Sequence, residues 1–360
     1  MKNFNKLLLS IAMLVTLFGC SSSENESKAK ETDKVEESAD ASGDVTDAEE
    51  IEIGEAAEAV ELVKEEDKVE IYERPIMVSV NNLPLAVKVQ TGLAPAYLIY
   101  EVPVEGGLTR LLACFQGEYP ELIGTCRSAR HYMLDYVLDN DAIFCHFGWS
   151  KYAIKRIQEL NINNLEGNSY DNAAYFRQNP EGLASEHTAY AYFDTLLEYI
   201  KTEKNYDMTT YRARPLKYSD TEVDVSGYPD SIPATDLGFN YTSCSTQYQY
   251  NEEEQRYYRY ANGNAHVDYF TKEHYSFKNV ILVELGGGYT MCDDGKNIDL
   301  KNLGDGYGYY ITNGYAVPIW WEKYSPYEQM KFYLNGEELQ INEGNTFIQL
   351  HLKQNTYYIN

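Results

Sequence analysis

The chain has 360 residues and a formal net charge of −26, with 56 Asp and Glu against 30 Lys and Arg. An acidic balance of this size argues against nucleic acid and against anionic lipid headgroups as partners. Beyond Cys20, five cysteines remain and none is close to another in the sequence, so the chain indicates neither a disulfide framework nor a Cys-x-x-Cys metal site.

The N-terminal 20 residues have the layout of a cleaved signal peptide. Lys2 and Lys6 precede an apolar run over 7–18, which is too short to span a bilayer because a spanning helix needs about 20 residues. Gly19-Cys20 resembles the lipobox, where the cysteine is alkylated with diacylglycerol and becomes the first residue. We therefore expect a lipid anchor at Cys20 that holds the protein on the outer face of the bacterial cytoplasmic membrane. An ordinary signal peptide with a chance cysteine is the alternative.

Residues 21–70 form an acidic segment, with 19 Asp and Glu, five Lys and no aromatic residue. Such a segment buries too little apolar surface to offset the entropy of ordering, so we expect a disordered tether. The rest of the chain carries about −14 and is long enough for two ordinary domains.

Residues 71–212 have the pattern of a mixed α/β domain. Apolar runs rich in β-branched and aromatic residues predict strands over 75–80, 97–104, 108–115 and 142–147. Glu105-Gly106-Gly107 is suited to join the second and third as a hairpin. Helices are expected from Arg127 or Ser128 to 138, over 151–160 with Ser150 as N-cap, and over 188–201.

Residues 213–234, with three prolines, read as a connector, and residues 235–360 read as a β-rich domain. Strands are expected over 241–246, 247–250, 257–261, 265–270, 280–284, 309–312 and 316–321. Turns of the positive-φ type are expected at Asn262-Gly263, Asp294-Gly295, Asn313-Gly314 and Asn335-Gly336. The fold class is therefore α+β: a mixed α/β N-terminal domain, then a mostly-β C-terminal domain with a sandwich or barrel-like sheet.

Short polar motifs recur in a fixed order along both predicted domains. They are Asn81-Asn82, Tyr100-Glu101, the run 104–110, Arg127-Ser128-Ala129-Arg130, His146-x-Gly148-x-Ser150, Gly263-x-x-His266-x-Asp268 and Gly344-Asn345-Thr346. Their order and spacing resemble the YerB-like bacterial lipoproteins, a family built from a two-part domain of unknown function. The resemblance covers about residues 71–360. It implies attachment to the bacterial surface and no established reaction.

Several charged and polar side chains lie in or beside apolar strands, where a charge is costly unless it is paired. The candidate ligand-binding residues are Asn82, Glu101, Glu105, Arg110, Arg127, Ser128, Arg130 and His146. Arg127 and Arg130 can clamp a carboxylate or phosphate bidentately, and an N-terminal helix end at Ser128 would favour the same anion. The alternatives are an ion-pair network that fixes the fold, or catalysis with Glu101 or Glu105 as general base.

Three functional hypotheses follow. The first is a surface binding or interaction module for an anionic cell-wall or envelope ligand or a partner. The second is a cell-wall-directed hydrolase with a Glu acid/base, and the third is a structural partner of envelope proteins. We expect no cofactor and no metal, because no such motif is present, and whether the protein is an enzyme stays open. The 34 tyrosines and the pair Trp320-Trp321 fit either a β-rich core or a glycan-facing surface.

Overall fold

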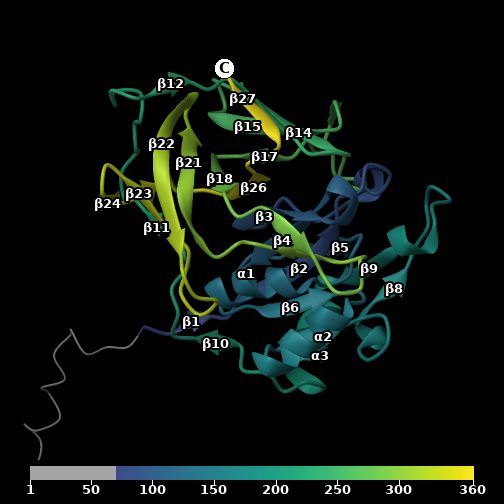
Figure 1. The fold of residues 1–360 in the computed structure, drawn as a ribbon. Coiled ribbons are helices and arrows are strands. Elements are labelled where there is room, and N and C mark those ends of the chain that lie inside the picture. Colours follow the sequence, from purple (N-terminus) through teal and green to yellow (C-terminus); the bar gives the residue numbers. More distant parts are fainter. Residues whose placement is uncertain (1–69) are drawn as a thin grey trace, which may run out of the picture. The chain divides into compact units, whose positions relative to one another are not determined.

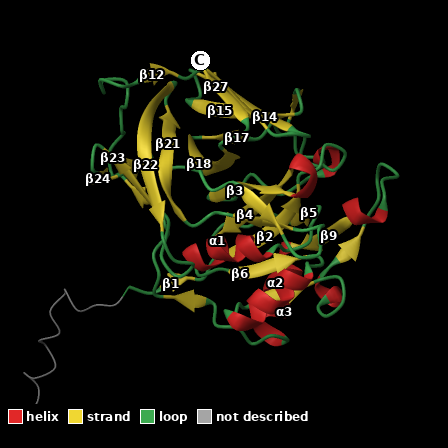
Figure 2. Cartoon of the chain, viewed as in Figure 1, coloured by secondary structure: helices red, strands yellow, loops and turns green. Residues whose placement is uncertain are grey.

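The computed structural model describes residues 70–360, which lie within one compact unit. The predicted signal peptide, Cys20 and the acidic segment up to residue 69 lie outside the described residues. The described part is mostly strand with few helices, and its three α-helices gather in one region (Figure 2). None of its helices is long and apolar enough to cross a membrane.

The main element is a 12-stranded mixed sheet (Figure 1). Its strands, in spatial order, are β24 (Glu337–Glu338), β23 (Lys331–Leu334), β22 (Tyr315–Lys323), β21 (Gly304–Thr312), β18 (Asn279–Leu285), β26 (Thr346–Leu352), β3 (Leu98–Val104), β4 (Leu108–Phe115), β2 (Ile76–Asn81), β6 (Ile143–His146) and β7 (Asn164–Glu166), with β12 (Ile232–Pro233) beside β22. Strands from both halves of the chain therefore share one sheet.

Strand β26 joins the two halves. It runs parallel to β18 on one side and parallel to β3 on the other. All seven of its residues are buried, as expected for a parallel strand covered on both faces. Successive side chains point to opposite faces, so Phe347 belongs to one hydrophobic cluster and Ile348 to the other.

A six-stranded antiparallel sheet and helix α3 (Phe193–Thr202) share a hydrophobic cluster with one face of the large sheet. The strands are β16 (Asn264–Ala265), β15 (Arg256–Ala261), β14 (Ser245–Asn251), β13 (Asp236–Asn240) and β27 (Thr356–Ile359), with β17 (Ser276–Phe277) beside β15. Helices α1 (Leu134–Asp139) and α2 (Lys151–Glu159) contribute to the cluster on the other face. The sheets and helices thus form stacked layers.

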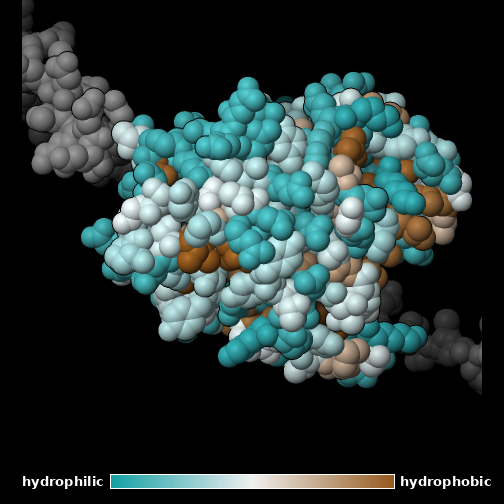
Figure 3. Space-filling view, turned by 90° about the horizontal axis from the view of Figure 1, so that it is seen from above, coloured by the Kyte–Doolittle hydropathy of each residue, from teal (hydrophilic) through white to brown (hydrophobic). Residues whose placement is uncertain are grey.

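Short strands complete the fold at the edges. They are β1 (Tyr72–Glu73) with β10 (Thr209–Thr210), β11 (Lys217–Tyr218) with β25 (Gln340–Ile341), β19 (Tyr289–Met291) with β20 (Ile298–Leu300), and β5 (Leu122–Gly124), β9 (Ala189–Tyr192) and β8 (Phe176–Arg177) in one small sheet. Seen from above the view of Figure 1, hydrophilic groups cover most of the surface and leave separate hydrophobic patches (Figure 3).

Several predictions that depend on local signals are confirmed. β3 and β4 form the predicted hairpin, and both Gly106 and Gly107 have positive φ in its turn. Ser150 caps α2, because its hydroxyl accepts a hydrogen bond from the Ala153 amide. The Asn-Gly pairs that begin at residues 262, 313 and 335 have positive φ at both positions.

Two helix predictions in the N-terminal half are wrong in part. Residues 127–130 are extended rather than helical, and a 3-10 turn begins only at His131. The cause is pairing with neighbouring segments: the Arg127 amide donates to Ser79, and the Ala129 amide donates to Gly148. The predicted helix over 188–201 begins at Phe193, since the preceding residues pair with β5 and β8 as β9.

The C-terminal half also differs in detail. Residues 245–251 form the single strand β14, so the predicted break between 246 and 247 is wrong. The predicted strand 265–270 ends at Ala265 apart from a single bridge at Val267, and a turn begins at residue 269. In this turn the Asp268 carboxylate accepts hydrogen bonds from the amides of residues 270 and 271. No local signal predicted β26 and β27, whose pairing partners lie far away in the chain. β13 was also missed, although it pairs with the neighbouring strand β14.

Because β26 holds both halves, we expect Ile348→Ala to destabilise the protein by about 2–5 kcal/mol, the range for a large aliphatic side chain removed from a core. Ile348 is 1% exposed. Chemical denaturation followed by tryptophan fluorescence measures the loss. The exposed Ile71 is the matched control, and Ile71→Ala should change the unfolding free energy by less than about 0.5 kcal/mol. Equal effects of the two substitutions would contradict this description of the core.

Candidate functional site

The structure places the eight candidate residues in three surroundings. Asn82 and Glu101 belong to a buried polar network between the two sheets. Glu105, Arg110, Arg127, Ser128 and Arg130 lie together near the carboxyl ends of β2 and β6. His146, the last residue of β6, makes its own local contacts. The structure therefore separates Glu101 from the arginines Arg110, Arg127 and Arg130, which we call the arginine corner.

Glu101 lies on β3, faces the six-stranded sheet and is fully buried. Its carboxylate accepts hydrogen bonds from the guanidinium of Arg259 on β15 at 3.0 Å, and from Asn82 at 3.0 Å. Thr109, Thr246 and Gln349 also donate to it. A charge in a buried site is tolerable when it is paired and hydrogen-bonded in this way. Both carboxylate oxygens are thus occupied and out of reach of a substrate.

Arg110 is also buried, at 4% exposure, but its surroundings differ. It lies on β4 opposite Asn81, the last residue of β2, and its Nη1 donates to the backbone carbonyl of Ser128. Within residues 70–360, no carboxylate forms an ion pair with Arg110, and its Nε has no hydrogen-bond partner. Burial, together with Arg130, lowers the pKa of Arg110 from 12.5 to about 9.

The other two arginines of the corner have acidic partners. The Nε of Arg130 binds both oxygens of Glu105, at 2.8 and 3.0 Å. Burial would raise the pKa of Glu105, but the hydrogen bond and charge of Arg130 outweigh it and hold this pKa below 4.5. Arg127 meets Glu186 at 3.4 Å, and because that carboxylate is half exposed, the pair is weak. Three arginines and two acids leave the corner with one excess positive charge.

Ser128 does not begin a helix, so the predicted helix N-terminus at the anion site is wrong. Its hydroxyl donates to the Phe147 carbonyl and thereby ties the loop 127–130 to the loop after β6. Gly148 permits this approach: it has φ of +84°, and an added Cβ would lie 2.8 Å from the Ser128 hydroxyl oxygen. The corner is built on tightly tied loops at the carboxyl ends of the parallel strands β2 and β6, the edge of a sheet where ligands commonly bind.

His146 has a structural environment. Its Nδ1 is 2.9 Å from the Gly148 carbonyl, and its Nε2 is 3.2 Å from the Asn164 side-chain oxygen. Burial lowers the pKa of His146, so the neutral ring is favoured. A neutral ring has one N–H, so it donates to one of these two oxygens, and the other nitrogen lies beside the second without donating to it.

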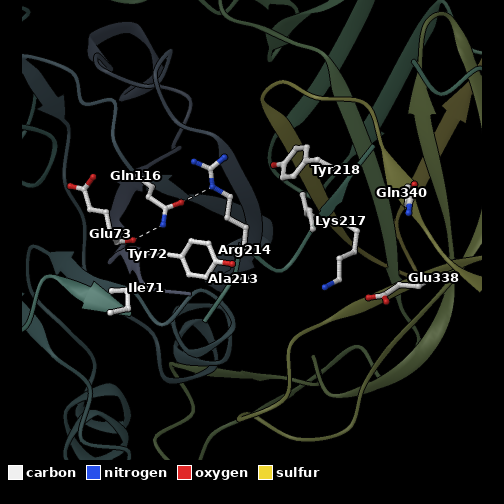
Figure 4. A pocket seen from close by; sticks show the side chains of 11 residues that line it. Ile71, Tyr72, Glu73, Gln116, Ala213, Arg214, Lys217, Tyr218, Glu338 and Gln340 are labelled. Carbon is white, nitrogen blue, oxygen red and sulfur yellow. Dashed lines mark hydrogen bonds between the residues drawn. The ribbon is translucent and has the colours of Figure 1, made fainter. Parts of the chain in front are cut away.

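Two other hollows lie away from the arginine corner. Two hollows of about 740 and 790 Å³ share Gln116, Arg214 and Tyr218 as lining residues. In Figure 4, Arg214 and Gln116 lie on one side of the first hollow and Tyr218 on the other, and the Arg214 Nε donates to the Gln116 Oε1 at 2.6 Å. The Arg214 guanidinium also lies 4.2 Å from the centre of the Tyr97 ring. Neither of these two hollows is lined by an arginine of the corner.

Two family models match the chain, one in its N-terminal half and one in its C-terminal half. Residues 62–207 match the family model described as the N-terminal domain of a protein of unknown function, DUF3048, and residues 236–348 match its C-terminal domain. The chain belongs to this family. The predicted resemblance to YerB-like proteins is therefore confirmed.

A curated relative, "Putative lipoprotein YerB" of Bacillus subtilis, is 29% identical over 286 residues, which are 76% of this chain and 83% of the relative. The crystal structure of YerB from Bacillus subtilis is similar with a TM-score of 0.68 and 25% identity, and the match covers 82% of this chain and 97% of that one. The DUF3048 fold is thus shared over nearly all of the solved relative, and the family description assigns no function.

Sequence reasoning grouped the three arginines with Glu101 and Glu105, and it missed the partners that Glu101 has in the structure. Arg259, Thr246 and Gln349 lie 145 to 248 residues away from Glu101 in the chain. The alternation of inward and outward side chains along β15 is the one signal that could have found Arg259. Arg259 occupies an inward position between Tyr257 and Ala261. An arginine at an inward position requires a buried acid as its partner.

Removing the Arg259 guanidinium from the network around Glu101 should strongly reduce the stability of the protein. Arg259→Met should cost about 3–5 kcal/mol of unfolding free energy, because Glu101 would stay buried without its counter-charge. Adding Glu101→Gln in the same chain should recover part of this loss. Urea denaturation of the wild type and both variants measures both effects, and a loss below about 1 kcal/mol for the single variant would contradict the assigned pairing.

The ion pair of Glu105 should make the stability of the fold depend on pH. Its pKa is lowered in the folded state, so its ionised form stabilises the fold above pH 4.5, and this contribution is lost as the pH falls through the lowered value. Wild type should therefore exceed Glu105→Gln in stability by at most about 1 kcal/mol at neutral pH, since the pair is partly exposed. The two unfolding free energies should converge in acid. A difference that grows with acidification would oppose this assignment.

Proposed function

We propose that this protein is a lipid-anchored, extracytoplasmic binding protein that holds an anionic ligand at the arginine corner. The ligand class is a carboxylate- or phosphate-bearing molecule of the cell envelope. The observation that carries the proposal is Arg110, a guanidinium at 4% exposure without a carboxylate partner in the described part of the chain.

The electrostatics favour an anion. Burying a guanidinium without a counter-charge is costly, and the lowered pKa of Arg110 expresses that cost. An oxyanion beside Arg110 would supply the missing charge and accept hydrogen bonds from the fixed fork of donors that a guanidinium presents. Arg127 lies at the same corner with a weak ion pair, so its guanidinium is available to the ligand as well.

The location rests on the N-terminal pattern. Cys20 follows a signal-peptide-like run, and the curated relative is named as a lipoprotein. A diacylglyceryl group at Cys20 would hold the protein on the outer face of the cytoplasmic membrane. Because the chain outside the signal and the acidic segment carries about −14, the protein as a whole repels anions. Binding would thus depend on close contact at the corner rather than on long-range attraction.

The two other hypotheses have less support. A hydrolase would need a free carboxylate near a substrate, whereas Glu101 is fully buried and Glu105 is bound through both oxygens to Arg130. A purely structural role of the corner is favoured by the pairs that Arg130 and Arg127 form with acids. Arg110 does not fit that role, because an unpaired buried charge weakens a fold.

The test is Arg110→Met in a thermal-shift titration with inorganic phosphate and with acetate. We expect phosphate or acetate to raise the melting temperature of the wild type. At a ligand concentration of 100 times the dissociation constant, the added unfolding free energy is about 2.7 kcal/mol. The variant should keep its ligand-free stability to within about 1 kcal/mol, because it loses one hydrogen bond and one unpaired charge. Its ligand-dependent rise should vanish.

Arg214→Met is the matched control, since it removes an arginine of the large hollow and should leave the rise intact. Two results would refute the proposal. One is a rise that persists in Arg110→Met. The other is a ligand-free variant that melts far below the wild type, which would make Arg110 a structural residue.

A further inference from the structure

A row of three aromatic side chains crosses neighbouring strands near the other end of the large sheet from the arginine corner. Tyr307 on β21 lies opposite Trp320 on β22, and Trp320 lies opposite Tyr333 on β23. Directly opposite side chains on one face of a sheet are in contact range. The Tyr307 and Trp320 rings are in contact, and Tyr333 lies opposite Trp320 on the next strand.

The alternation of β22 sends its two tryptophans to opposite faces. Trp321 is 1% exposed and donates its Nε1 to the Glu284 carbonyl, so it is a core residue. Trp320 is half-buried on the outer face, beside Tyr307, which is 69% exposed. Of the two predicted roles for this pair, Trp321 takes the core role and Trp320 lies at the surface.

The rings line a hollow of about 390 Å³ together with Pro318, Ile319, Glu322 and Asn335. The Tyr307 and Trp320 rings are 5.0 Å apart between centroids, and their planes meet at 84°. A flat sugar ring stacks best on coplanar aromatic faces, whereas two perpendicular rings form a corner. A corner suits a compact, roughly spherical group, which meets aromatic surface from two directions.

The charge at this hollow is negative. Glu322 lies on the same face as Trp320, and its carboxylate accepts a hydrogen bond from the Tyr333 hydroxyl at 2.6 Å, which raises the pKa of Tyr333 to about 12. No lysine or arginine lines the hollow. Across the strands, Glu322 is opposite Asp305 on one side and Lys331 on the other. Within residues 70–360, Glu322 forms no ion pair with Lys331.

We propose that this hollow binds an alkylammonium group, such as the head of a quaternary amine. A cation is attracted to the π faces of Trp and Tyr by their quadrupoles, and an ammonium with aliphatic substituents also buries apolar surface. Glu322 supplies the counter-charge from the rim. The site is separate from the arginine corner and takes a ligand of the opposite charge.

Choline is the probe, titrated into the full-length chain in detergent while tryptophan fluorescence is followed. Its neutral isostere 3,3-dimethyl-1-butanol is the matched ligand, because it has the same shape without the charge. We expect choline to bind at least tenfold more tightly than the isostere. Trp320→Ala should abolish the response and Glu322→Gln should weaken binding at least threefold.

Trp149→Phe is the control, since it removes a tryptophan that does not line this hollow and should retain choline binding. Arg110→Met should also bind choline normally, so failure of this site and failure of the anion site are distinguishable. Equal binding of choline and the isostere would show a merely apolar hollow and overturn the proposal. A response to chitotriose without one to choline would show a glycan site instead, and no response to choline would overturn it as well.

Discussion

The ion pair between Glu101 and Arg259 is the constraint on which the layered structure depends. Glu101 points from the large sheet and Arg259 from the six-stranded sheet, and both side chains are fully buried. Neither charge is tolerable in that position without the other, so the two sheets must meet in one register. Asn82, Thr109, Thr246 and Gln349 complete the carboxylate's hydrogen bonds from four different segments. We infer that this network gives the interface specificity rather than net stability.

Arg259 and Arg110 show how the same side chain serves different purposes. Both are buried, but the charge of Glu101 outweighs the effect of burial and raises the pKa of Arg259, whereas burial and neighbouring arginines lower that of Arg110. The first guanidinium is satisfied by the fold. The second is held in place by the Ser128 carbonyl and lacks a counter-ion among the described residues. That difference is the physical basis for assigning structure to one arginine and binding to the other.

The parts that follow from local chemistry could be predicted from the sequence. The glycine turn between β3 and β4, the Ser150 cap and the Asn-Gly turns need only neighbouring residues. The sequence also placed Arg110, Arg127 and Arg130 together at the strand ends, but it grouped Glu101 with them, whereas Glu101 pairs with Arg259. The extended backbone of 127–130 was not predictable, since it depends on hydrogen bonds to Ser79 and Gly148 that no local pattern reveals.

The remaining features could not be predicted because they depend on pairing between strands that are far apart in the sequence. β26 carries no strong turn or cap signal, and its place between β3 and β18 follows from contacts with residues about 250 and 67 positions away. The partner of Glu101 and the row of rings on β21, β22 and β23 depend in the same way on strand register. Register decides which side chains meet, and one residue of slip would exchange Trp320 and Trp321 between surface and core.

The most direct test of the account is a crystal structure of the protein grown with selenate, whose anomalous scattering locates the anion without assumptions about its shape. The account predicts a selenium peak with oxygens within hydrogen-bonding distance of the Arg110 guanidinium and near Arg127. An anion found only elsewhere, such as beside Arg214, with the arginine corner empty at saturating selenate, would contradict it.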